Sequence, residues 1–215
     1  MPSPEVLVPR PPDVDAGTPR VLLVVGSGRS GRTGSRVGQW TADRLARALS
    51  YEVPCVYTSD LGLADLPGEL LSERERRLLD RTSRLLAWAT SVVVVTPEYN
   101  RSFPASLKTF IDAHREEWVA TPTAFVSYGG ISRGLRAVEQ LGSVLGELHA
   151  VPVRDGVPLD PAQAAALDVD ADHGGAEAGF SRMVDHLLWW DAALTAAVRS
   201  SPYPSSMAVG RRRSG

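Results

Sequence analysis

The chain has 215 residues, of which 43% are hydrophobic and 22% are charged, and its formal net charge is -2. This length supports one well-buried domain, and the lack of a strong positive charge argues against a nucleic acid partner. Cys55 is the only cysteine, so no disulfide can form within the chain. No segment reads as a membrane span or a secretory leader. We therefore expect a cytoplasmic protein that binds neither nucleic acid nor membrane.

The two ends of the chain differ in composition from its middle. Residues 1–19 are rich in Pro, Asp and Gly, and residues 201–215 contain Pro202, Pro204 and three consecutive arginines. Such segments bury too little apolar surface to fold. We expect a disordered arm over 1–19, a folded domain over 20–200 and a disordered tail over 201–215.

The first half of the domain alternates between apolar runs and helical patterns. The run VLLVV at 21–25 predicts a strand that is covered on both faces, and residues 35–49 carry apolar side chains at helical spacing. A second strand is expected at 53–57. A loop then leads to a charged helix at 72–89, where Ser72 and Glu75 have the spacing of a capping box.

The second half repeats the alternation. A third strand at 91–96 precedes a helix that begins near Pro104, and a fourth strand at 122–127 precedes a helix over 134–148. A short fifth strand at 150–154 and a last helix at 176–199 follow. Helical crossovers between apolar strands predict an α/β fold with a five-stranded parallel sheet and helices on both faces. With strand order 2-1-3-4-5, the loops after strands one, three and four meet where ligands bind in such sheets.

The loop after the first strand, GSGRSGRTGS at 26–35, is built to hold a phosphate, because it offers freely turning backbone N–H groups, hydroxyl donors and arginines. Three interpretations are open. The pattern GxGxxG is typical of dinucleotide sites, but the acidic residue at the end of the second strand is missing. The pattern GxxxxGRT is close to a Walker A loop, but Arg32 stands in place of its lysine. A terminal phosphate monoester suits the donors Ser27, Arg29, Thr33 and Ser35 best.

Three loops together carry a resemblance to a known family. GSGRSGRTGS after the first strand, TPEYNRSFPASLKTFID after the third and SYGGISRGLRAVEQL after the fourth are similar to the NAD(P)H-dependent FMN reductases of the flavodoxin-like fold. The resemblance covers roughly residues 20–150. It implies a three-layer flavodoxin-like sandwich, bound FMN, and NADPH or NADH as the hydride donor.

The resemblance also implies roles for individual residues. In that family the first loop binds the ribityl phosphate of FMN, and the other two loops flank the isoalloxazine ring. The residues implied for the phosphate are Ser27, Arg29, Thr33, Gly34 and Ser35; those for one ring edge are Pro97, Glu98, Tyr99 and Asn100; those for the other are Ser127, Tyr128, Gly129 and Gly130. Many members have Asn near the end of the first loop, where this chain has Gly34 and Ser35.

The implied function is an FMN-dependent NAD(P)H oxidoreductase that passes electrons to a flavin, a quinone, an azo compound or another small acceptor. The flavin carries the chemistry, so no catalytic side chain is named. We expect Arg101 or Arg133 to bind the 2′-phosphate of NADPH. The alternative is a flavodoxin-type electron carrier that serves protein partners, but the near-neutral charge and the Gly-rich third loop favour the enzyme.

Two further expectations concern metals and assembly. The segment DVDADHGG at 168–175 resembles a calcium loop, but His173 stands at the position of its glycine and Gly179 at that of its closing glutamate, so no metal is expected. Family members are commonly dimers or tetramers. The apolar residues 187–190 of the last helix exceed what one sheet face needs, which predicts a homodimer or homotetramer.

Overall fold

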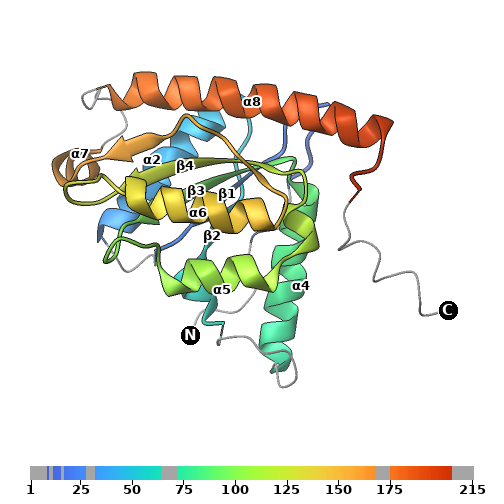
Figure 1. Cartoon of the computed structure of the whole chain (residues 1–215), viewed down its shortest axis with the longest axis horizontal. Helices are drawn as coiled ribbons and strands as arrows, with labels where there is room; N and C mark the ends of the chain where they lie inside the picture. Colours follow the sequence, from blue (N-terminus) through green and yellow to red (C-terminus); the bar gives the residue numbers. More distant parts are fainter. Residues whose placement is uncertain are drawn as a thin grey trace.

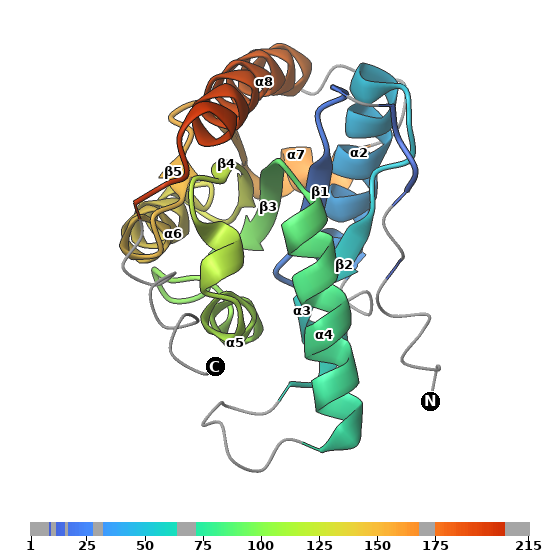
Figure 2. The ribbon, with the colours of Figure 1, turned by 90° about the vertical axis from the view of Figure 1, so that its right-hand side faces the viewer.

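The computed structural model describes residues 9, 12–15, 17–27, 32–63, 72–167 and 175–204. A central parallel sheet lies between two layers of helices, as Figures 1 and 2 show. Much of the expected arm over 1–19 and of the expected tail over 201–215 lies outside the described residues, so their disorder stays a prediction.

The centre of the sheet confirms the predicted strand order. The strands β1 (Val21–Val25), β2 (Cys55–Tyr57), β3 (Ser91–Pro97) and β4 (Pro122–Tyr128) are parallel, and the order runs β2-β1-β3-β4-β5. Every residue of β1, β3 and β4 is buried. Because helices cover both faces, these strands read as continuous apolar runs rather than alternating ones.

The far edge of the sheet differs from the expected single strand at 150–154. Two short strands, β5 (Val151–Pro152) and β6 (Val157–Leu159), both pair with β4, so the sheet has six strands rather than five within the described residues. Between β5 and β6 the chain moves away from β4 and approaches it again at Gly156, where an added Cβ would lie 2.7 Å from the Phe125 carbonyl oxygen. As a result, β5 pairs with the first part of β4 and β6 pairs with its last part.

The helices divide between the two faces as the apolar side chains require. On one face, α2 (Arg32–Leu49), α7 (Pro161–Ala166) and α8 (Ala176–Ser200) pack on the side chains of Leu23, Val93 and Val126. The other face is covered by α3 (Thr58–Leu61), α4 (Glu73–Trp88), α5 (Ala105–Ala113), the 3₁₀ helix η1 (Glu116–Trp118) and α6 (Leu135–Glu147). Alternate residues of each strand therefore supply two separate cores.

The start of α4 confirms a local prediction. The Ser72 side chain accepts from the backbone of Glu75, and the Glu75 carboxylate accepts from the backbone of Ser72, which completes the capping box. The short elements α3, η1 and α7 were not predicted, because pieces of three to six residues leave no periodic pattern. Within the described residues, no helix combines the length and apolar character needed to cross a bilayer. The location in the cytoplasm stays a prediction.

Candidate active site

The loops after β1, β3 and β4 meet at one edge of the sheet. The Gly26 N–H donates to the Val95 carbonyl at 2.8 Å, and the Glu98 N–H donates to the Tyr128 carbonyl at 3.0 Å. Adjacent parallel strands in this register end together. The three loops that the sequence singled out therefore lie side by side at the carboxyl edge of the sheet, where ligands bind in doubly wound folds.

The first loop packs tightly where it enters α2. Ser27 is buried, and its Oγ lies 3.1 Å from the hydroxyl of Tyr128, which donates to it. An added Cβ at Gly34 would come within 1.9 Å of Ser27 Oγ and 3.0 Å of the Tyr128 hydroxyl. A side chain at position 34 would therefore require Ser27 or the start of α2 to move.

The start of α2 can hold an anion. Because α2 begins at Arg32, the backbone N–H groups of Thr33 and Gly34 belong to its first turn, where N–H groups have no partner within the helix. A helix start of this kind favours negative charge. Arg29, another residue of the predicted phosphate set, lies outside the described residues.

Tyr128 is a structural tyrosine within this site. Its side chain is buried in the core that faces α2 and α8. Burial raises the pKa of Tyr128, and the hydrogen bond with Ser27 opposes that rise. The phenol therefore keeps its proton at neutral pH and acts as a donor toward the first loop.

The second loop closes in a tight hairpin turn. The Ser102 N–H donates to the Tyr99 carbonyl at 3.0 Å, and the Tyr99 N–H donates to the Ser102 carbonyl at 2.8 Å. The two central residues, Asn100 and Arg101, have φ values of 50° and 71°. This is the pattern of a type I′ turn, in which Asn is favoured first and Gly second. Arg101 therefore holds a strained conformation at the second position.

Glu98 turns away from solvent and toward α6. Its side chain is only 9% exposed, and its carboxylate accepts from the Ser132 hydroxyl at 2.5 Å and from the Arg136 N–H at 3.3 Å. The Arg136 guanidinium lies 3.7 Å from the other carboxylate oxygen. The carboxylate thus links the second loop to the third, and neither Ser132 nor Arg136 was singled out in the sequence.

The third loop depends on a glycine that sequence reasoning missed as a site residue. Gly134 has φ of 85°, and an added Cβ would lie 2.7 Å from Ser127 Cβ and 2.8 Å from the Tyr128 N–H nitrogen. The Ser127 hydroxyl donates to the Arg133 carbonyl at 2.9 Å and so fixes the loop from within. A signal was present, because Gly134 directly precedes α6.

The two predicted glycines of the third loop differ from each other. At Gly129 an added Cβ would approach the Gly134 nitrogen at 3.1 Å and Glu98 Cβ at 3.2 Å, whereas at Gly130 it would meet open space. Gly129 is thus needed for packing between the two loops. Gly130 leaves room beside the loop, which is what a flat ring against backbone requires.

The two arginines proposed for the nicotinamide cofactor stand in different surroundings. Arg133 has an ion pair with Asp160, at 3.4 Å, and Asp160 is also the N-cap of α7. Arg101 lies exposed at the tip of the hairpin turn. Of these two arginines, Arg133 would have to break its ion pair with Asp160 in order to bind a phosphate.

The second and third loops each carry a large exposed side chain. Tyr99 is 58% exposed, and Ile131 is fully exposed. Ile131 was not identified in the sequence, because an isolated isoleucine in a loop gives no pattern. Exposed side chains of this kind are suited to stack on a flat organic molecule.

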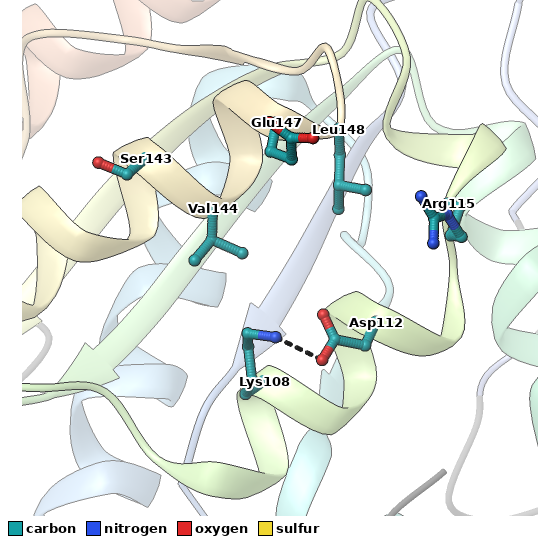
Figure 3. Close-up of a pocket in the computed structure, with 7 residues that line it drawn as sticks. All are labelled: Lys108, Asp112, Arg115, Ser143, Val144, Glu147 and Leu148. Carbon is teal, nitrogen blue, oxygen red and sulfur yellow. Dashed lines mark hydrogen bonds and ion pairs between the residues drawn. The ribbon is translucent and has the colours of Figure 1, made fainter. Parts of the chain in front are cut away.

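A separate groove lies between α5 and α6. One cavity of about 430 Å³ is lined by Lys108, Asp112, Arg115, Ser143, Val144, Glu147 and Leu148, and Figure 3 shows the ion pair between Lys108 and Asp112 on its floor. A neighbouring cavity of about 470 Å³ shares Lys108 and Val144 and reaches Ser102. This groove touches the second loop from the α5 side.

The described residues contain no cluster of His, Cys, Asp and Glu that could hold a metal ion. The predicted calcium-like segment lies almost wholly outside the described residues. The absence of a metal stays an expectation for that segment.

The residues at this edge fit FMN. The start of α2 offers N–H groups to a phosphate, and the loops after β3 and β4 are held next to each other with a side-chain-free backbone at Gly130. A helix start that can accept an anion, next to two adjoining loops, suits a flavin mononucleotide, which has an anionic tail on a flat ring.

Known proteins resemble this chain in sequence and in fold. A sequence profile of the NADPH-dependent FMN reductase family matches residues 19–164. An NAD(P)H-dependent FMN reductase of Schizosaccharomyces pombe is 32% identical over 136 residues, which is 61% of this chain and 68% of that protein. A quinone reductase of Pseudomonas putida is 31% identical over 112 residues, 50% of this chain and 58% of that protein.

A solved structure shows the same fold at lower identity. The flavoenzyme NAD(P)H:(acceptor) oxidoreductase FerB from Paracoccus denitrificans superimposes with a TM-score of 0.58 at 21% identity, covering 80% of this chain and 97% of that one. The fold is therefore flavodoxin-like, as expected. With its profile match over residues 19–164 and its three converging loops, the chain belongs to the family of NADPH-dependent FMN reductases, oxidoreductases that use NAD(P)H and FMN.

Proposed function

We propose that this protein is an FMN-dependent NAD(P)H oxidoreductase that reduces a small acceptor. The observation that carries the proposal is the meeting of the three loops at one sheet edge, with the Tyr128 hydroxyl on Ser27 and the Glu98 N–H on the Tyr128 carbonyl. When bound, FMN would supply the chemistry of hydride transfer from the nicotinamide and of electron transfer to the acceptor. The chain supplies position and electrostatics, and no side chain is assigned as a general acid or base.

The proposed cofactor contacts follow the described geometry. The backbone of Thr33 and Gly34 and the hydroxyls of Ser27 and Ser35 would hold the phosphate at the start of α2, and Arg29, outside the described residues, is proposed from the sequence to add a positive charge. The backbone of the second loop, from Pro97 through Tyr99 to Asn100, and that of the third loop at Gly129 and Gly130 would hold the ring. Glu98, Ser127 and Tyr128 act from behind these loops, because their polar side-chain atoms bond to protein groups.

The acceptor class is a flavin, a quinone or an azo compound. The relative from Pseudomonas putida that is named a quinone reductase supports the quinone. The exposed side chains of Tyr99 and Ile131 at the rim are suited to cover a flat acceptor. Initial rates with a flavin, a benzoquinone and an azo dye, measured at equal NADPH, would rank the three classes.

The direct test is FMN binding followed by NADPH oxidation. We expect the purified protein to quench the fluorescence of added FMN and to oxidise NADPH in the presence of an acceptor. A flavodoxin-type carrier would bind FMN but oxidise almost no NADPH. Failure to bind FMN at all would refute the proposal.

The 2′-phosphate of NADPH is proposed to bind Arg101. Arg101 lies exposed next to the ring loops, whereas Arg133, the other candidate, pairs with Asp160. Arg101→Ala should raise KM for NADPH and leave KM for NADH unchanged, since only NADPH carries that phosphate. Arg133→Ala is the comparison, and a selective effect there instead would move the site to the third loop.

Arg101→Gly separates charge from backbone strain. Glycine suits the second position of a type I′ turn, so this variant removes the guanidinium while it relaxes the turn. Equal KM values for NADPH in the Gly and Ala variants would assign the effect to the lost charge.

We also propose a homodimer or homotetramer. In the apolar run at 187–190, Leu187 is buried in the core, whereas Trp189 is 64% exposed and stacks edge to face on the exposed ring of Trp190 at 5.1 Å. An exposed aromatic pair of this kind is typical of interfaces. Light scattering should give twice or four times the mass of 23.1 kDa, and a monomer at micromolar concentration would contradict the proposal.

A further inference from the structure

Two polar contacts hold the second loop on α6. At its start, the Glu98 carboxylate accepts from the Ser132 hydroxyl at 2.5 Å and from the Arg136 N–H at 3.3 Å. The carboxylate lies at the amino end of α6, where the helix dipole favours negative charge. This contact fixes the loop directly after β3.

The second contact lies at the hairpin turn. The Ser102 hydroxyl donates to Gln140 Oε1 at 2.6 Å, and Gln140 Nε2 donates to the Arg101 carbonyl at 3.0 Å. The amide of Gln140 therefore satisfies one donor and one acceptor of the turn at once. Gln140 is exposed and belongs to α6, so its contacts with the turn do not result from core packing.

Besides its backbone N–H, Arg136 brings its guanidinium to 3.7 Å from the Glu98 carboxylate, so side chains of α6 approach both ends of the second loop. Arg136 and Gln140 are four residues apart in α6, which places them one above the other on the same side. The loop from Glu98 to Ser102 runs along this side and is attached at each end. Its orientation is thereby tied to α6 rather than to the sheet alone.

The turn needs such an attachment because its backbone is strained. Arg101 has φ of 71°, and a left-handed conformation costs a residue other than Gly, Asn or Asp about 1 kcal/mol or more. Strain of this kind persists only where surrounding contacts hold it. Gln140 contacts the residues on the carboxyl side of the turn, Arg101 and Ser102, where the less suited residue stands.

We infer that Gln140, together with Glu98, positions the second loop by attaching it to α6. The backbone at Tyr99 and Asn100 would then meet the flavin ring at a fixed distance. Both are positioning residues that act through the loop backbone. The inference rests on the proposed function and adds to it a set of residues that sets ring position independently of the phosphate contacts at α2.

The test compares Gln140→Ala with Gln39→Ala. Both replace an exposed glutamine in a helix, and the Gln39 amide donates to Asp43 on α2, apart from the second loop. Gln140→Ala should raise the Kd of FMN and of riboflavin by the same factor, about three- to tenfold. The ratio of the two Kd values measures the contribution of the phosphate to binding, and it should stay unchanged. Flavin reduction at saturating NADPH should slow by about tenfold or more, since small displacements cost much in hydride transfer.

A second variant pair tests the other attachment. Glu98→Gln keeps an acceptor for the Ser132 hydroxyl and should have a smaller effect than Glu98→Ala. Glu117→Gln is its control, because the carboxylate of Glu117, in η1, also accepts from a serine hydroxyl, that of Ser83 in α4. The visible absorbance maximum of bound flavin should shift in the Glu98 variants and not in Glu117→Gln.

A measurement without cofactor keeps the inference separate from the proposed function. In the cofactor-free protein, the amides of Tyr99 and Ser102 should exchange hydrogen faster in Gln140→Ala than in Gln39→Ala. Equal exchange, or equal rates of flavin reduction in the two variants, would overturn the inference. Failure of the wild-type protein to bind FMN would overturn the proposed function, while the exchange measurement would still decide the attachment of the loop.

Discussion

The hydroxyl of Tyr128, at the end of β4, donates a hydrogen bond of 3.1 Å to the Oγ of Ser27, in the loop after β1. The bond passes over the end of β3, since β3 lies between β1 and β4 in the sheet. It connects the loop proposed to hold the phosphate with the loop proposed to hold the ring. Both partners are buried, so the bond is not exchanged for water.

Tyr128→Phe removes this bond and little else. We expect the free energy of unfolding to fall by about 1 kcal/mol and the Kd of FMN to rise about fivefold, because the first loop must then be ordered by the ligand. Urea unfolding and fluorescence titration measure the two effects. Tyr51→Phe is the control, since Tyr51 bonds to the backbone at Val21 and Pro19, at the opposite end of β1. An equal change in Kd for both variants would show that the bond has no specific role.

Gly34→Ala should block the first loop. The new Cβ would stand 1.9 Å from Ser27 Oγ, so either Ser27 or the start of α2 must move. We expect a loss of about 1–3 kcal/mol in stability and at least a tenfold rise in the Kd of FMN. Gly146→Ala is the matched control, because an added Cβ there meets nothing within 4 Å. Normal FMN affinity in Gly34→Ala would refute the assignment of the phosphate to this helix start.

Gly134→Ala should disturb the third loop. Position 134 combines φ of 85° with a Cβ that would lie 2.7 Å from Ser127 Cβ, so both the backbone and its neighbour resist the change. We expect a loss of more than about 2 kcal/mol in stability, measured by urea unfolding. Gly142→Ala, in the middle of α6 with open space around it, should instead gain up to about 1 kcal/mol. A similar effect of the two substitutions would contradict the described geometry.

Stability should fall as pH decreases below about 6.5, the usual pKa of histidine, because of His114. Its Nδ1–H donates to the Phe110 carbonyl at 2.8 Å, and the Thr82 hydroxyl lies 2.7 Å from Nε2. Burial lowers the pKa of His114, against smaller opposing effects that include the charge of Glu117. The unfolded chain therefore binds a proton in a range where the folded protein does not, and stability rises with pH there.

Urea unfolding between pH 5 and 8 measures that slope. In His114→Gln the part of the slope due to this residue should disappear, although stability at pH 8 also falls. His186→Gln is the control, because His186 lies exposed and pairs with Asp155. A slope that survives unchanged in His114→Gln would contradict its assignment to His114.

The sequence by itself determined the central sheet, its strand order and the loops at its carboxyl edge. Buried parallel strands read as continuous apolar runs, and the VLLVV run and the six residues from Ser91 to Thr96 allowed no other assignment. The capping box at Ser72 was likewise readable, because its signal lies within four residues. The resemblance of three loops to one family then gave the cofactor.

Only the tertiary structure decided how the side chains of these loops are used. The contacts of Glu98 with Ser132, of Gln140 with Ser102 and of Tyr128 with Ser27 join residues 34 to 101 positions apart, and no local pattern encodes such pairs. The division of β5 and β6 along β4 has the same origin, since it depends on the approach of Gly156 to Phe125. Local spacing fixes periodicity and turns, whereas the partner of a polar side chain is set by which strands and helices the whole chain brings together.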